Sequence, residues 1–322
     1  MGKQNVLITG ISGQDGVFLA NRLIKEFSNK IKIYGISRQK PSATLNKIYS
    51  LGTKVQNLEI LNIDLENSAT VLDIIEKIQP TQIYNLSGPS SVYDSLKNPK
   101  IFSQTINLIF NNLTNACLKL KLLPNFFQAC SSEMFSSSNA MPLNEKSNFS
   151  PRSPYAQAKY EVFNKVNDLK ESHNWNINSG IMFNHESEFR NKNYLFTKIF
   201  ESAKLIKQKK LDYLEVGSLD LRRDWSFAGD IANAIYLINQ SEIKSNFVIG
   251  SGKAFSINEL IQKVFYLYGI DFESHIKINS ALLRPGDPMF MVSDPTLIKQ
   301  TLNWKNEYSL DDLIERIFSK IN

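Results

Sequence analysis

A tyrosine and a lysine four residues apart, Tyr155 and Lys159, form a pair whose types and spacing suit proton transfer. On a helix, which we expect over residues 154–171, this spacing places both side chains on one face. The charge of Lys159 would lower the pKa of the Tyr155 phenol and make it an acid or base near neutral pH. Ser131 and Ser132 follow an apolar segment typical of a strand, where a serine hydroxyl can hydrogen-bond a reacting oxygen.

A Tyr-x-x-x-Lys pair arises often by chance, and a glycine motif near the start of the chain gives it context. Gly10, Gly13 and Gly16 follow the apolar run 5–9 and precede a helix-like stretch over 17–27. Such a loop, at a helix N-terminus, lets backbone N–H groups approach a pyrophosphate. We therefore expect a nicotinamide dinucleotide here, with Ser12, Gln14 and Asp15 in the same loop; a plain glycine-rich turn is the alternative.

Arg38, two residues after the second expected strand, bears on which dinucleotide binds. A cofactor without the 2′-phosphate usually meets a carboxylate near this point, whereas an arginine can pair with that phosphate. The sequence thus favours NADP over NAD, although Arg38 can equally be a solvated surface cation. Asp64 and Leu65, after the third strand, are placed where they can hold the adenine edge.

Apolar strands and helical segments alternate through the first half of the chain. This predicts an α/β fold of the Rossmann type, a doubly wound parallel sheet with helices on both faces. We expect residues 1–183 to form the dinucleotide-binding domain, with later segments at about 226–250 returning to it, and 184–322 to form a smaller, mixed C-terminal substrate lobe. The expected strands are 5–9, 32–36, 58–63, 82–86, 125–129 and 177–183, and the expected helices are 17–27, 69–78, 106–120 and 154–171.

Composition places the chain among globular proteins. It has 322 residues, of which 42% are hydrophobic, and a net charge of +6 without a basic block long enough to bind nucleic acid. Cys117 and Cys130 lie in apolar segments, typical of buried thiols in a reducing compartment, and their spacing predicts no metal site. No apolar run reaches membrane length, so we expect a cytoplasmic protein that meets no membrane.

Further segments carry a family resemblance. The segments are GISGQDG (10–16), YNLSGPSSV (84–92), ACSSEMF (129–135), PRSPYAQAK (151–159), FNHES (183–187), LRRDW (221–225) and RPGD (284–287). The glycine loop, Asn85-Leu86, Asn107, Ser131 and the Tyr155/Lys159 pair resemble the extended short-chain dehydrogenase/reductase superfamily. Taken together, the segments resemble the GDP-mannose 4,6-dehydratases, and FNHES and RDW are the distinctive ones.

The resemblance implies a redox-neutral lyase reaction on a nucleotide sugar. Tyr155 would take the proton of the C4 hydroxyl while a hydride passes from C4 to NADP, Glu133 would take the C5 proton and help water leave from C6, and the hydride would return to C6. Ser131 stands where the family usually has threonine, and either hydroxyl can donate. Glu133 alone is equally readable as a helix cap or a surface carboxylate, and some nucleotide-sugar decarboxylases have a similar Ser-Glu.

The remaining site residues are predicted from their motifs. The diphosphate of GDP-mannose needs cations, and an arginine fork suits its oxygens. The predicted cofactor residues are Gly10, Ser12, Gly13, Gln14, Asp15, Gly16, Arg38, Asp64, Leu65, Leu86, Tyr155, Lys159 and His185. The predicted substrate residues are Ser90, Glu133, Asn184, Arg190, Lys198, Arg222, Arg284 and Asp287, with Arg223 as a further candidate. His185 can instead be a structural hydrogen-bonding residue, and the arginines can form salt bridges. By resemblance, Asp287 would hold the ribose hydroxyls.

The chain also departs from the family pattern. Phe135-Ser136 replaces the usual Tyr-Gly, and residues 188–191 read Glu-Phe-Arg-Asn where the family has Pro-Arg-Arg-Gly. The second change leaves the sugar open, with GDP-heptose as an alternative to GDP-mannose. The loop after Arg38, which helps build the tetramer in relatives, is short, so a homodimer and a homotetramer both stay open.

Two other functions compete with dehydration. A nucleotide-sugar epimerase or 4-keto reductase would share the superfamily motifs, but a reductase would not need Glu133. A non-catalytic dinucleotide sensor would not need Ser131, Tyr155 and Lys159 together. The retained proton-transfer set thus argues for an enzyme.

Overall fold

The computed structural model describes residues 4–135, 140–283 and 286–321. Seven strands form one parallel sheet in the order β10-β6-β5-β4-β1-β2-β3. Its strands are β1 (Gln4–Thr9), β2 (Ile31–Ile36), β3 (Leu58–Leu61), β4 (Gln82–Asn85), β5 (Asn125–Ser131), β6 (Ile177–Met182) and β10 (Phe247–Ile249). This confirms the predicted Rossmann-type sheet. The strand order reverses between β1 and β4, and ligands of such sheets bind beyond the carboxyl ends of the strands at that point.

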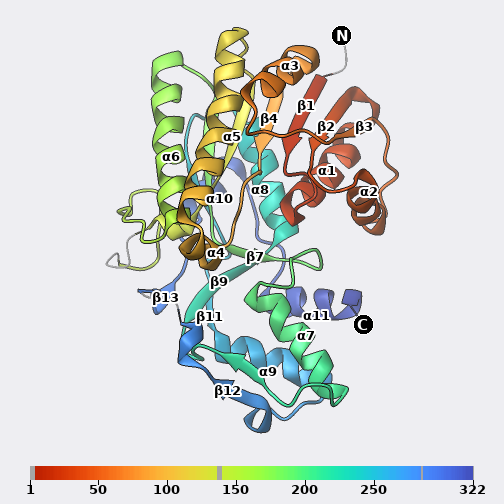
Figure 1. Cartoon of the computed structure of the whole chain (residues 1–322), viewed down its shortest axis with the longest axis vertical. Coiled ribbons are helices and arrows are strands. Elements are labelled where there is room, and N and C mark those ends of the chain that lie inside the picture. Colours follow the sequence, from red (N-terminus) through yellow and green to blue (C-terminus); the bar gives the residue numbers. More distant parts are fainter. Residues whose placement is uncertain (1–3, 136–139, 284–285, 322) are drawn as a thin grey trace.

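Helices cover both faces of this sheet. On one face lie α1 (Gln14–Phe27), α2 (Pro41–Ser50) and α8 (Ala228–Gln240); on the other lie α3 (Ser68–Ile78), α4 (Val92–Lys97), α5 (Pro99–Lys119) and α6 (Pro154–His173). Figure 1 shows α5 and α6 running alongside each other on one flank. Alternation along β1 explains the two layers, because Val6 and Ile8 pack with α1 while Leu7 packs with α3 and α5.

The C-terminal part adds shorter elements. Its strands are β7 (Asn184–Glu186), β8 (Leu214–Val216), β9 (Arg222–Phe227), β11 (Ala254–Ser256), β12 (Ile276–Ile278) and β13 (Phe290–Met291). Its helices are α7 (Leu195–Lys207), α9 (Ile257–Tyr268), α10 (Thr296–Leu302) and α11 (Leu310–Ile321). Short 3-10 turns lie at Ser28–Lys30, Ser132–Met134, Glu273–His275 and Ser280–Leu282. In Figure 1, α7, α9, α11 and β12 lie together beyond one end of the large sheet.

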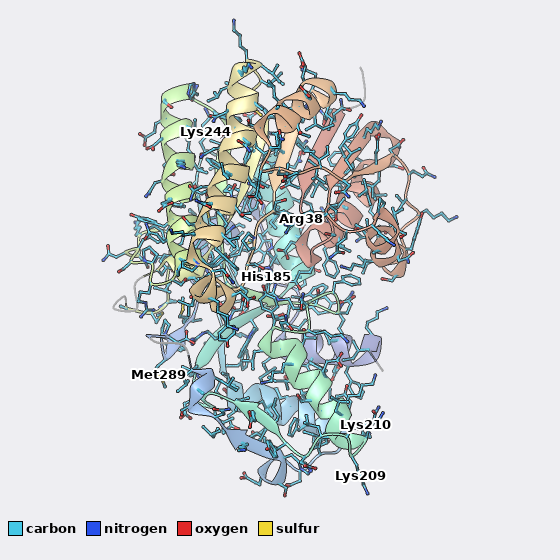
Figure 2. All side chains as sticks on the ribbon, in the orientation of Figure 1. Arg38, His185, Lys209, Lys210, Lys244 and Met289 are labelled. Carbon is cyan, nitrogen blue, oxygen red and sulfur yellow. The ribbon has the colours of Figure 1, made fainter. Side chains whose placement is uncertain are left out.

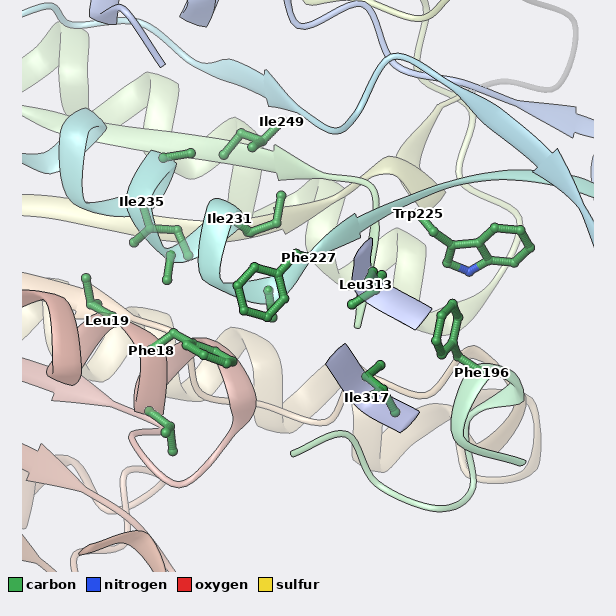
Figure 3. Packing of buried hydrophobic residues seen from close by; sticks show 14 of the residues in the cluster. Phe18, Leu19, Phe196, Trp225, Phe227, Ile231, Ile235, Ile249, Leu313 and Ile317 are labelled. Atoms are coloured by element: carbon green, nitrogen blue, oxygen red, sulfur yellow. The ribbon is translucent and has the colours of Figure 1, made fainter. Parts of the chain in front are cut away.

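One hydrophobic core joins the sheet to this C-terminal part. Figure 3 shows Phe18 and Leu19 of α1 beside Phe227 and Ile231, and Leu313 and Ile317 of α11 in the same packed region. Phe196 and Trp225 continue the cluster toward α7, with their rings 6.3 Å apart. Within the chain, α8 and β10 return to the large sheet, while the division at residue 183 stays a prediction.

Several element boundaries differ from those expected. Helix α1 begins at Gln14 rather than at Val17, because the polar residues of the glycine loop already form its first turn. Helix α5 begins at Pro99 rather than at Ile106, with the proline at its first position, where its missing N–H costs nothing. Helix α2 was not predicted from the sequence, because its buried face consists of little more than Thr44 and Ile48. Strand β5 extends through Ser131, so this serine belongs to the strand itself.

Both cysteines are free and buried, as expected. Burial raises the pKa of Cys130 to about 11, which makes its thiol a poor nucleophile at neutral pH. Among the described residues, no helix is long and apolar enough to cross a membrane, and no cluster of three or more His, Cys, Asp or Glu side chains is arranged to hold a metal ion.

Candidate active site

The glycine loop packs tightly against the end of β4. Gly10 has a φ of +70°, and a Cβ there would lie 2.8 Å from the carbonyl oxygen of Leu86, so any other residue would be excluded by backbone atoms. A Cβ on Gly16 would lie 2.5 Å from the Cα of Ile11. In contrast, a Cβ on Gly13 would meet only the Gly10 carbonyl oxygen, at 3.4 Å. The loop is therefore closed toward the sheet and open at Gly13, the N-cap of α1.

This open side suits a pyrophosphate. The first N–H groups of α1, from Gln14 to Gly16, have no carbonyl four residues earlier within the helix, so they are suited to bind phosphate oxygens. The Gln14 side chain serves another purpose, because its amide donates to His185 O at 2.8 Å and accepts from the Ser187 hydroxyl at 2.9 Å. The residues present fit a dinucleotide, with the Gln14 backbone as the part that meets phosphate.

Asp15 would oppose an anionic ligand if its charge were not balanced. Its carboxylate lies 3.1 Å from Nε2 of His185, whose Nδ1 donates to Phe183 O at 2.7 Å. Burial opposes the charge on Asp15, but His185 and then Arg190 outweigh it and lower its pKa. Burial likewise opposes a charged His185, yet Asp15 raises the pKa of His185. Both ring nitrogens of His185 thus act as donors, and the imidazolium neutralises Asp15 beneath the phosphate loop.

The residues predicted to hold adenosine lie at the ends of β2 and β3. Arg38 is exposed, and Figure 2 shows it on the flank of the sheet formed by the N-terminal segments. Asp64 is exposed and accepts the backbone N–H of Glu66, while Leu65 is buried. One cation was missed by the sequence analysis: Lys47 of α2 donates to Ser12 O at 2.7 Å, beside the glycine loop. No motif surrounds Lys47, so only the fold reveals it.

The predicted catalytic residues gather where β5 meets α6. The hydroxyls of Tyr155 and Ser131 hydrogen-bond to each other, and the Ser131 hydroxyl accepts the backbone N–H of Glu133 at 3.3 Å. Glu133 is close enough to Tyr155 for its charge to raise the pKa of the phenol. Lys159, 6% exposed, donates to the carbonyl oxygen of Ala129 at 2.8 Å. A hydroxyl, a phenol and a carboxylate are therefore brought to one point.

The electrostatics of this point differ from our expectation for Lys159. Burial dominates and raises the pKa of Tyr155, and the Ser131 hydrogen bond only partly offsets it. Burial also lowers the pKa of Lys159, whose ammonium lies 5.9 Å from the centre of the Tyr155 ring. Lys159 is not among the main influences on the Tyr155 pKa, because its ammonium is directed to Ala129 O and not to the phenol oxygen. Tyr155 is a neutral phenol in this state.

A chain of buried polar groups supports Lys159 from behind. Thr9 donates to Asn85 at 2.7 Å, and Asn85 donates to Gln128 at 2.7 Å. The Gln128 amide then donates to Ala129 O at 2.9 Å, the same oxygen that accepts from Lys159. Three neighbouring strands, β1, β4 and β5, are thereby cross-linked behind the lysine. Sequence reasoning missed Thr9 and Gln128, since their pairing depends on strand order.

The FNHES and RDW segments are neighbours in space. Strand β7 pairs in parallel with β9, with Asn184 opposite Trp225 and His185 opposite Ser226. In Figure 2, His185 lies between the large sheet and the C-terminal elements. The turn after β7 carries Arg190, whose guanidinium lies 3.6 Å from the centre of the Tyr194 ring. Arg190 is near enough for the Tyr155 phenol to contribute to raising its pKa, although the contacts of its guanidinium are with Glu186 and Tyr194.

Other predicted substrate residues are held elsewhere by their own contacts. Lys198 donates to Glu215 O at 2.9 Å, which ties it to β8. Arg223 and Asp287 form a buried ion pair with each other at 2.7 Å. Arg222 pairs with Glu259 at 3.2 Å and lines a cavity of about 620 Å³ that includes no predicted catalytic residue. Arg284 lies outside the described residues.

The arrangement as a whole is that of a nucleotide-binding α/β enzyme. The same fold occurs in UDP-glucose 4-epimerase from Thermotoga maritima, with a TM-score of 0.84 and 19% identity over 99% of this chain and 100% of that chain. It also occurs in RMD from Pseudomonas aeruginosa complexed with NADPH, with a TM-score of 0.79 and 19% identity over 98% of each chain. Identities this low establish the fold alone.

Sequence comparison gives the family. A model of the family described as GDP-mannose 4,6 dehydratase matches residues 7–317. The human protein named GDP-mannose 4,6 dehydratase is 32% identical over 343 aligned residues, covering 98% of this chain and 91% of that protein. The chain belongs to the GDP-mannose 4,6 dehydratase family, which confirms the resemblance seen in its motifs.

Proposed function

We propose that this protein is a nucleotide-sugar 4,6-dehydratase that converts GDP-mannose to GDP-4-keto-6-deoxymannose. One observation carries the proposal: the backbone of Glu133 donates to the Ser131 hydroxyl at 3.3 Å, and its carboxylate is near enough to Tyr155 to raise the pKa of that phenol. Removal of water across C5 and C6 needs a base for the C5 proton in addition to the acid/base at C4. An epimerase or a reductase needs only the acid/base at C4.

The chain's own residues divide the proton transfers between them. To take the proton of the C4 hydroxyl, Tyr155 has to act as its phenolate, so it must first lose the proton that burial favours in the structure. Ser131 holds the developing ketone oxygen through its hydroxyl. The glycine loop and the first turn of α1 would hold NADP, which would supply the hydride chemistry that leaves the overall reaction redox-neutral. Glu133 removes the C5 proton, which the neighbouring ketone has made acidic, and helps the C6 hydroxyl leave as water. The hydrogen bond from Lys159 to Ala129 O fixes the position of the lysine ammonium near Tyr155.

Replacing the proposed C5 base tests this mechanism. Glu133→Gln keeps the size and hydrogen-bonding capacity of the side chain but cannot accept the proton, so we expect product formation to fall about 10²- to 10⁴-fold. Solvent-deuterium incorporation at C5, followed by NMR, should fall equally. Glu171→Gln, on an exposed glutamate at the end of α6, is the matched control.

Two outcomes of that experiment would count against the proposal in different ways. Full dehydration by Glu133→Gln would remove Glu133 from the role of base while leaving the reaction intact. Failure of the unmodified protein to release a 4-keto-6-deoxy product from GDP-mannose or GDP-heptose would sink the proposed function itself. Running both sugars side by side identifies the hexose or heptose that is used.

The preference for NADP is a further part of the proposal. Arg38 is an exposed arginine directly after β2, where a carboxylate would repel a 2′-phosphate, and Lys47 adds a second cation at the loop. We expect Arg38→Ala to weaken NADP binding by about tenfold or more, through the loss of a charge-assisted contact, and to leave NAD binding unchanged. Isothermal titration with both cofactors measures this, with Lys40→Ala as the control. Equal losses for the two cofactors would contradict the assignment.

We further propose that the protein acts in the cytoplasm as a homodimer or a homotetramer. The two free, buried thiols support a reducing compartment. The assembly follows from the family resemblance, and sedimentation analysis of the full chain distinguishes the two sizes.

A further inference from the structure

A tyrosine that the motifs did not single out closes the site from the C-terminal side. The Tyr194 hydroxyl lies 2.7 Å from the hydroxyl of Ser90, and either oxygen can be the donor. Ser90 belongs to the loop after β4, and Tyr194 precedes α7, so the contact joins segments 104 residues apart. It is a direct bridge between the large sheet and the C-terminal elements at the mouth of the site.

The Tyr194 ring is held in a fixed orientation. The guanidinium of Arg190 stacks over it at 3.6 Å from the ring centre, a cation–π contact at close range. Tyr194 also stands near enough to Tyr155 to contribute to raising the pKa of that phenol. A hydroxyl on a rigid, stacked ring beside the proton-transfer tyrosine is well placed to orient a ligand there.

The hydroxyl pair has hydrogen-bonding capacity to spare. Each hydroxyl can donate one hydrogen bond and accept two, so the Ser90–Tyr194 contact uses only one donor of the two. A ring hydroxyl of a hexose can accept the remaining one and donate in return. Arg190, beside them, supplies positive charge for the diphosphate attached to the sugar.

We infer that Tyr194 is a sugar-binding residue, whose hydroxyl acts with Ser90 to hydrogen-bond a ring hydroxyl of the bound hexose and present C4 to Tyr155. The inference rests on the proposed function, in that the ligand is taken to be a GDP-hexose. Tyr194 would make a contact that neither the glycine loop nor the catalytic residues provide, and this contact would be to the sugar alone.

Binding measurements separate a sugar contact from a nucleotide contact. We expect Tyr194→Phe, which keeps the stacked ring and removes only the hydroxyl, to weaken GDP-mannose binding about tenfold, the effect of losing one hydrogen bond to the ligand. Binding of GDP, which has no hexose, should not change. Ser90→Ala should behave alike, and the double variant should lose less than the product of the two single losses, because both hydroxyls act on one group.

A matched control and the contrary results complete the experiment. Tyr213→Phe removes a phenol hydroxyl that accepts a hydrogen bond from Lys277, next to the β8–β12 pair, and should alter neither affinity. Equal weakening of GDP and GDP-mannose by Tyr194→Phe would show a structural role and overturn the inference, as would no weakening at all. So would an unmodified protein that binds GDP-mannose no more tightly than GDP.

Failure of the proposed function would look different. A protein that binds GDP-mannose more tightly than GDP through Tyr194, yet releases no 4-keto product, would retain the sugar contact and lose the dehydratase assignment.

Discussion

Two arginine–glutamate pairs flank the same turn, and they are built in opposite ways. In the inner pair, Glu186 and Arg190 both belong to β7 and the turn after it, whereas in the outer pair Glu188 of the turn meets Arg316 of the C-terminal helix α11. Their side chains are almost equally exposed, 6% and 20% in the first pair and 7% and 20% in the second. Burial therefore does not distinguish the two pairs, and the difference lies in how their hydrogen bonds are arranged.

The outer pair is fully engaged. Arg316 donates to both carboxylate oxygens of Glu188, at 2.6 and 3.2 Å, and its guanidinium lies 4.6 Å from the centre of the Phe227 ring. A bidentate contact with an aromatic neighbour is the strong form of an arginine ion pair. It fastens α11 to the turn that follows β7.

The inner pair is close but poorly aligned. Nε of Arg190 lies 3.2 Å from Oε2 of Glu186, yet both of these buried atoms are without a hydrogen-bond partner among the described residues. Burial raises the pKa of Glu186, only partly offset by Arg190. An unsatisfied buried charge is costly, and such groups are kept where they serve a ligand. The contrast supports the proposal that Arg190 binds an anion of the substrate while the outer pair holds the turn.

The largest effect that tests this contrast is expected at the inner pair. Arg190→Met should lower kcat/KM for GDP-mannose about 100-fold, close to 3 kcal/mol, because a cation for the diphosphate is lost. The free energy of unfolding should change by less than about 1 kcal/mol, since Glu186, whose pKa burial already raises, can take up a proton. Steady-state kinetics and urea unfolding of the same preparation measure the two quantities.

The lysine variant sharpens this result. Arg190→Lys keeps the charge and loses the planar fork, so its kcat/KM should lie between those of Arg190→Met and the unmodified protein. If Arg190→Met were fully active but markedly less stable, the inner pair would be a structural clamp like the outer one, and the contrast would be wrong.

The sequence predicted the parts of the fold that depend on local pattern. Long apolar strands and helices alternate up to residue 183, and periodicity identifies such elements well. The C-terminal strands β7, β8, β11 and β13 have only two or three residues each, too few for any alternation to be recognised. Helix α2 was missed for a related reason, because only Thr44 and Ile48 of its residues are buried.

The site residues also divide into those that a local sequence pattern predicts and those that depend on long-range contacts. Tyr155 and Lys159 are found from spacing on one helix and Ser131 from its place at a strand end, whereas the role of Glu133 comes from the family resemblance. The contacts of Gln14 with His185, of Ser90 with Tyr194 and of Glu188 with Arg316 join residues 171, 104 and 128 positions apart. Such pairings depend on how the C-terminal elements dock onto the sheet, and no local pattern encodes them.

A smaller effect, on stability rather than activity, is expected at the outer pair. Arg316→Met leaves the Glu188 carboxylate buried without its partner, and should lower the free energy of unfolding by about 2 kcal/mol, somewhat below the cost of breaking a fully buried pair because the arginine is partly exposed. Thermal and urea unfolding measure the loss. The double variant Arg316→Met/Glu188→Gln should recover most of it, since no buried charge remains.

The activity of the single variant separates the two pairs. At a temperature where Arg316→Met is folded, its kcat/KM should stay within about threefold of the unmodified value, because Arg190 keeps its place. A loss of activity as large as that of Arg190→Met, in a folded Arg316→Met protein, would show that the outer pair sets the position of the inner arginine and that the two pairs form one unit.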